Sequence, residues 1–196
     1  MKRSITLLLL LLNCGLIFGQ NTSGEVRYKV KINMWANLPE DMDEDRMDAV
    51  KEWVPEWMIV DKMLLFNSGE SLFLNVPEDE NNDEVDPNER GGGMRFMMMG
   101  GGANADEKFY SDIANKTKVE QKDLMGKLFL IEDSLQPIEW KLPGEMKVIQ
   151  GYTCMNATTM RDSTEFEVWF TMDIPVSSGP MGVHGLPGLV LEATTD

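Results

Sequence analysis

The stretch STEFEVWFTMDIPV, residues 163–176, alternates between polar and apolar side chains over most of its length. From Glu165 to Phe170, acidic side chains fall on one face of an extended chain and large apolar side chains fall on the other. A period of two is typical of a β-strand with one buried face. Residues 146–160 alternate as well. We therefore predict a long hairpin that turns at Arg161–Asp162.

The same period recurs in shorter segments along the chain, and turn residues separate them. The further strands that we predict span residues 24–36, 58–66, 71–76, 108–113, 117–125, 126–134 and 189–195. Residues 41–54 differ, because their apolar side chains recur at helical spacing after an acidic start, and Pro55 follows. One short helix among many strands predicts a mainly β fold, with a curved antiparallel sheet or half-barrel around a core.

The composition excludes one class of partner, and the N-terminus indicates export. The chain has 33 acidic and 18 basic residues, a formal charge of −15, so we expect no nucleic-acid binding. Lys2 and Arg3 precede an apolar run, Leu7–Leu12, and small residues follow. This order predicts a signal peptide over residues 1–19, and its apolar run is too short for a helix that spans a membrane. Lipid attachment at Cys14 is the alternative. We expect no transmembrane segment in the single domain, residues 20–196.

Residues 77–107 interrupt the pattern of strands. Their first half is acidic, and their second half places methionines between two glycine triplets. We predict a flexible insertion here. Thioether sulfur is a soft ligand that selects Cu(I), and His184 is the sole histidine. The residues of this hypothetical copper site are Met94, Met97, Met98, Met99, Met181 and His184. A solvated loop and a contact surface for a partner are the alternatives.

Glycine and proline are concentrated in residues 179–188, GPMGVHGLPG, which we call the corner. These residue types fix or free the backbone in consecutive turns. Leu186 and Leu189 flank the Pro187–Gly188 step, so each can enter the core from its own side. We predict a structural corner, with the rim of a ligand site as the alternative.

Residues 185–190, Gly-Leu-Pro-Gly-Leu-Val, resemble the motif of the GLPGLI family, with valine in place of the last isoleucine. The resemblance extends over residues 107–196 and includes GYTCMNA and WFTMDIP. It implies an exported protein of Bacteroidota-type bacteria, in the periplasm or at the outer membrane, often encoded near TonB-dependent receptors. It implies a sheet similar to those of lipoprotein carriers or lipocalins, and it implies no established activity. Because such chains continue past the motif, we expect that a C-terminal part is missing.

Three hypotheses for function follow. The first is a non-enzymatic binding or accessory protein of the cell envelope, which holds an apolar ligand or docks to a partner such as a TonB-dependent receptor. The apolar residues assigned to its ligand site are Trp140, Phe166, Trp169, Phe170 and Leu189. The second is copper binding through the Met-rich loop; otherwise we expect no cofactor. The third, a thiol enzyme that uses Cys154 and His184, has no support from neighbouring motifs.

Overall fold

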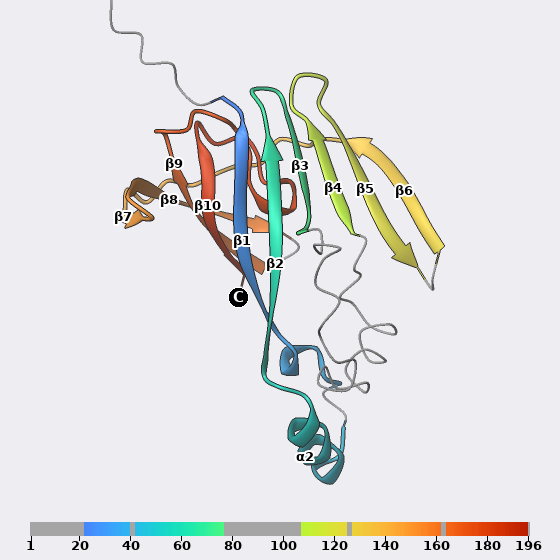
Figure 1. Cartoon of the computed structure of the whole chain (residues 1–196). Coiled ribbons are helices and arrows are strands. Elements are labelled where there is room, and N and C mark those ends of the chain that lie inside the picture. The colour runs from blue at the N-terminus through green and yellow to red at the C-terminus, as the bar shows by residue number, and fades with distance from the viewer. Residues whose placement is uncertain (1–21, 40–41, 77–106, 125–126, 162–163, 196) are drawn as a thin grey trace, which may run out of the picture.

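The structure is a computed structural model that describes residues 22–39, 42–76, 107–124, 127–161 and 164–195. The predicted mainly β class is confirmed, and the strands divide between two antiparallel sheets (Figure 1). The six-stranded sheet follows chain order: β1 (Gly24–Asn33), β2 (Trp57–Phe66), β3 (Glu70–Asn75), β4 (Lys108–Asp112), β5 (Thr117–Leu124) and β6 (Lys127–Ser134). The four-stranded sheet has the order β10 (Leu189–Thr195), β9 (Thr164–Thr171), β8 (Tyr152–Arg161) and β7 (Met146–Ile149).

The predicted helix is present as α2 (Glu44–Trp53), in the connection between β1 and β2. Asp43 caps its N-terminus by accepting a hydrogen bond from the backbone N–H of Arg46 at 2.9 Å, and two acidic residues follow in the first turn. None of its residues is buried, and it projects beyond the ends of β1 and β2 (Figure 1). A 3-10 turn, η1 (Trp35–Asn37), precedes it. No helix in the described part of the chain is long and apolar enough to cross a membrane.

The predicted hairpin is present as β8 and β9, but its first arm is shorter than predicted. Gln150 and Gly151 both have positive φ, at 50° and 87°, and they separate β7 from β8. Positive φ at both central residues is the requirement of a two-residue hairpin turn that matches strand twist. The segment 138–142 contributes an isolated bridge between Lys141 and Thr158 in place of a strand.

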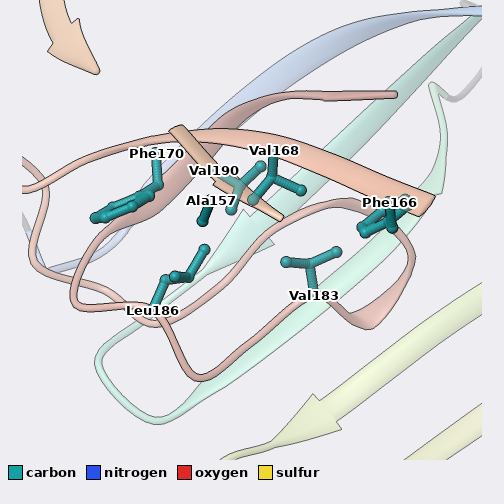
Figure 2. Packing of buried hydrophobic residues seen from close by; sticks show 7 residues of the cluster. All are labelled: Ala157, Phe166, Val168, Phe170, Val183, Leu186 and Val190. Carbon is teal, nitrogen blue, oxygen red and sulfur yellow. The ribbon is translucent and has the colours of Figure 1, made fainter. Parts of the chain in front are cut away.

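Two apolar clusters form the core, and β10 contributes to both. The corner cluster comprises Ala157, Phe166, Val168, Phe170, Val183, Leu186 and Val190 (Figure 2). The inter-sheet cluster comprises Leu64, Phe66, Phe73, Ile174, Val176 and Leu189. Successive residues of a strand point to opposite faces, so Leu189 packs against the six-stranded sheet while Val190 packs against β8 and β9. One strand thereby joins the two layers.

The corner is close-packed against its surroundings, as predicted. Leu186 is 4% exposed and Leu189 is fully buried, one in each cluster. A Cβ on Gly188 would lie 2.0 Å from the carbonyl oxygen of Thr171, and a Cβ on Gly182 would lie 2.1 Å from the ring of Phe109. Both distances are far below van der Waals contact; the clash at Gly188 is with backbone, and Gly182 has a positive φ of 74°, so both positions favour glycine. The close approach at Gly182 brings the 3-10 turn η2 (Pro180–Gly182) against β4 of the other sheet.

The remaining predictions about chain organisation fall outside the described residues. The signal peptide, residues 1–19, lies outside them, as does the insertion except for Glu107. Both therefore stay predictions.

Candidate functional site

A cleft of about 520 Å³ opens where the corner meets the six-stranded sheet. Strands β4 and β5 supply one wall, and residues 133–139, which lead out of β6, supply the next. The end of β8 and the turn η2 complete the lining. The cleft thus lies between the two sheets, and the corner fixes its shape on one side.

Charged side chains form the wall on β5 and β6. Lys118 Nζ donates a hydrogen bond to Glu120 Oε1 at 2.9 Å and lies 3.9 Å from Asp133 Oδ2. Lys122 Nζ contacts the second oxygen of Glu120 at 2.7 Å. Burial alone raises the pKa of Glu120, but the hydrogen bonds from Lys122 and Lys118 outweigh it, so the net pKa is lowered. Glu120 is therefore ionised at neutral pH and holds both lysines in place.

Apolar side chains line the cleft as well: Met160 on β8, Met181 on η2, and Phe109 on β4, where it pairs with Glu120. Met160 and Met181 are 59% and 51% exposed, so both residues are accessible to a ligand. The ring of Phe109 is half-buried and lies 5.9 Å from Lys118 Nζ, within the range of a cation–π contact. Methionine adapts its shape to irregular partners. The cleft therefore combines fixed charged groups with adaptable apolar side chains.

His184 ties the corner to the chain that leaves β6. Its Nδ1 lies 2.8 Å from the carbonyl oxygen of Gly182, and its Nε2 lies 3.0 Å from that of Gln136. Its own carbonyl oxygen accepts a hydrogen bond from Trp140 Nε1 at 2.9 Å. From the sequence we assigned Trp140 to a ligand site and His184 to a metal site. In the structure one hydrogen bond joins them, and of the two only His184 lines the cleft.

The five residues assigned to an apolar ligand site do not line the cleft. Phe166 is 4% exposed, and Phe170 and Leu189 are fully buried in the two clusters. Trp140 packs against Phe166, with ring centroids 6.5 Å apart. Trp169 points to the other face of β9, where Lys147 Nζ lies 4.2 Å from its ring. The structure thus gives these side chains packing partners, and Trp169 lies apart from the other four.

Two of the six residues of the hypothetical copper site lie in the described part of the chain. Met94 and Met97–Met99 lie outside the described residues, whereas Met181 and His184 both line the cleft. Both ring nitrogens of His184 already lie at hydrogen-bonding distance from carbonyl oxygens. Within the described ranges, no three or more His, Cys, Asp or Glu residues are grouped as metal ligands. Copper binding stays a prediction.

The proposed thiol–histidine pair is not assembled. The Cys154 side chain is fully buried, and its Sγ lies 3.6 Å from the carbonyl oxygen of Tyr152. Burial raises the pKa of this thiol. Cys154 does not line the cleft, and both ring nitrogens of His184 face backbone carbonyl groups. A buried, protonated thiol beside no free imidazole lacks the arrangement of an activated nucleophile.

Sequence reasoning missed the charged wall of the cleft. Phe109, Lys118, Glu120 and Asp133 come from three strands and form no local motif. The register that pairs Phe109 with Glu120, and Lys118 with Asp133, brings them together. The available signal was weak: Lys118 and Glu120 fall on the same face of a predicted strand, two residues apart.

Part of the chain matches a known protein family. Residues 159–192 match the family described as "Protein of unknown function (Porph_ging)", a match that is consistent with the GLPGLI-type resemblance. This range covers β9, the corner and the start of β10. No curated protein matches the chain.

Two solved structures of PNGF-II match the chain, one of them with a TM-score above 0.5. The structure in space group P21 matches with 19% identity and a TM-score of 0.52, over 89% of this chain and 26% of that chain. The structure in space group C2 matches with 22% identity and a TM-score of 0.49, over 71% and 23%. The chain thus spans about a quarter of the length of PNGF-II. At these identities the likeness concerns the fold alone. From β9 to β10 the chain is similar to a Bacteroidota-associated family of unknown function.

Proposed function

We propose that the protein is a non-enzymatic binding protein of the cell envelope whose ligand occupies the cleft between the two sheets. The observation that carries the proposal is the cleft itself, which has about 520 Å³ of space and is lined by both charged and apolar side chains. Small-molecule sites are typically concave, partly apolar and supplied with a few positioned polar groups. The exposed residues Met160 and Met181 line the same cleft as the Lys118–Glu120 pair.

The lining favours an amphipathic ligand over a purely apolar one. Met160, Met181 and the ring of Phe109 offer contacts to an apolar body. Lys118 and Asp133 offer a donor and an acceptor in the same cleft, where Glu120 fixes Lys118. Phe166 and Phe170 of β9 are buried in packing, and Trp169 is half-buried beside Lys147. We therefore assign the ligand to the cleft in place of the aromatic set expected from the sequence.

The setting of this function comes from the sequence. The signal peptide expected over residues 1–19 supports export, and the GLPGLI-type resemblance supports a place in the envelope of Bacteroidota-type bacteria. A TonB-dependent receptor is the partner that the resemblance favours. An exported binding protein beside such a receptor would hold a ligand before or after its transport.

The test is the binding of the fluorescent apolar probe N-phenylnaphthylamine, followed by its displacement with lipid extracted from a Bacteroidota envelope. We expect Met181→Gln and Met160→Gln to weaken probe binding several-fold, because both remove apolar contact at the cleft. Met172→Gln is the matched control, since Met172 is 54% exposed and does not line the cleft. Equal affinities for all three variants would show that the probe binds elsewhere.

Copper binding is the second candidate. The observation that favours it is that Met181 and His184, two of its six residues, line the same cleft. Titration of Cu(I) against a competing chelator tests it. Replacement of Met94 and Met97–Met99 by leucine should weaken the affinity for Cu(I) at least tenfold, because leucine offers no sulfur ligand. An unchanged affinity would exclude the loop as a copper site.

A further inference from the structure

Strand β6 exposes apolar side chains on both of its faces. Leu128 and Leu130, on one face, are 56% and 70% exposed; Phe129 and Ile131, on the other, are 46% and 42% exposed. β6 forms the outer edge of the six-stranded sheet (Figure 1) and pairs with β5 alone among the described strands. The backbone N–H and C=O groups on the side of β6 opposite to β5 therefore point away from the sheet.

This edge lacks the features by which proteins usually protect an exposed strand. Proline, a bulge and a central charge are the common devices. β6 contains no proline, and its pairing with β5 is continuous from Thr117↔Ser134 to Leu124↔Lys127. Its charged residues lie at the two ends, with Lys127 before the apolar run and Glu132–Asp133 after it. The centre of the strand is thus open to pairing.

We propose that β6 pairs antiparallel with β6 of a second copy of this chain, about a two-fold axis at Leu130. In an antiparallel pair, two residues directly opposite each other either both direct their backbone N–H and C=O groups toward the partner strand or both direct them away from it. These two orientations alternate along a strand. In a pair of two β6 strands, opposite residues must therefore both have odd numbers or both have even numbers, so that the two numbers add to an even sum. An axis at Leu130 satisfies this condition and joins the two six-stranded sheets into one.

The sequence of β6 complements itself in this register. Lys127 lies opposite Asp133 of the partner subunit, and Phe129 lies opposite Ile131 of the partner subunit, each twice by symmetry. Opposite charges and apolar pairs directly across antiparallel strands are favourable. Lys127 has no ion-pair partner within the described ranges, and the side chain of Asp133 is 61% exposed beside Lys118. An axis at Phe129 would place Lys127 opposite an isoleucine, without charge pairing.

Sedimentation equilibrium of the purified chain at 0.15 M salt tests the proposal. We expect a monomer–dimer equilibrium, and we expect Leu130→Lys to weaken the dimer at least tenfold, because two lysines would meet at the axis. Val148→Lys is the matched control on edge strand β7, since Val148 and Leu130 are both 70% exposed. A wild-type chain that stays monomeric at every concentration overturns the proposal. This holds even if a different protein pairs with β6.

Charge reversal tests the register. Lys127→Asp alone would place two acidic residues opposite each other at both ends of the pair, and should weaken dimerisation about threefold. The double variant Lys127→Asp/Asp133→Lys should restore it, because each new lysine meets a new aspartate. Circular dichroism monitors the fold of each variant. A double variant as weak as the single one, with the fold intact, contradicts the register centred on Leu130.

Discussion

Tyr28 Oη donates a hydrogen bond to the carbonyl oxygen of Val190 at 2.6 Å, across 162 positions of sequence. Tyr28 lies on β1, at the edge of the six-stranded sheet, and Val190 lies on β10, at the edge of the four-stranded sheet. The same ring contacts Phe73 edge to face, with centroids 6.1 Å apart. One side chain thus bonds to the second sheet while it packs against the first.

We expect Tyr28→Phe to lower the free energy of unfolding by about 1 kcal/mol, because the ring stays in place and one partly buried hydrogen bond is lost. Urea unfolding measures the change. Lys29→Ala, on the exposed face of the same strand, should change it by less than about 0.5 kcal/mol. Equal effects of the two substitutions would mean that the contact between the sheets contributes no stability.

The same tyrosine predicts a loss of stability at high pH. Burial raises the pKa of Tyr28 well above the ordinary value near 10. Above pH 10 the unfolded chain releases this proton while the folded chain keeps it, so stability falls as pH rises. Urea unfolding from pH 9 to 11 should give a smaller fall for Tyr28→Phe than for the wild type. Identical slopes would contradict the buried position of the hydroxyl.

Gly188→Ala should disrupt the corner. Its new methyl group would overlap the carbonyl oxygen of Thr171, which belongs to β9 and cannot move without disturbing the pairing with β10. We expect a loss of about 3 kcal/mol, the upper range for overpacking. Gly69→Ala is the control, because no atom lies within 4 Å of its new methyl group. Comparable thermal stability of the two variants would contradict the close packing at Gly188.

Substitution of an aromatic residue on β9 should lower the free energy of unfolding by an amount that depends on which face of the strand the residue occupies. Phe170→Ala removes a fully buried ring from the corner cluster and should cost about 3–5 kcal/mol. Trp169→Ala, on the other face, should cost much less. The two are compared by urea unfolding of the protein without ligand. If Phe170 served a ligand site and not the core, its loss would leave the stability of the free protein nearly unchanged.

Side-chain alternation made β9 and most other strands predictable, because a half-buried strand repeats every two residues. The division into two sheets was not predictable in this way. The pattern identifies which face of β9 is buried, but not whether a second sheet, the corner or a ligand covers it. The turn at Gln150–Gly151 was missed because glutamine is uncommon at positive φ. The aromatic side chains were assigned to a ligand site because a buried core and an apolar ligand site favour the same residue types.

The glycines and leucines of the corner were predictable from turn chemistry, whereas the cleft beside it was not. Its polar wall depends on the register of β4, β5 and β6, which places Lys118 beside Asp133. Long-range pairing of this kind leaves no local pattern in one sequence. The two residues of the cleft that the sequence did single out, Met181 and His184, were chosen for their metal-binding chemistry.

The central claim is that the ligand binds in the cleft, and methyl NMR of the 16 methionines tests it most directly. The chain would be labelled at the methionine methyl groups and titrated with the envelope lipid that displaces the fluorescent probe. We predict that the signals of Met160 and Met181 shift with the same affinity, while those of Met63 and Met172 stay in place. Shifts confined to Met94–Met99, or no shift at Met181 at saturation, would contradict the claim.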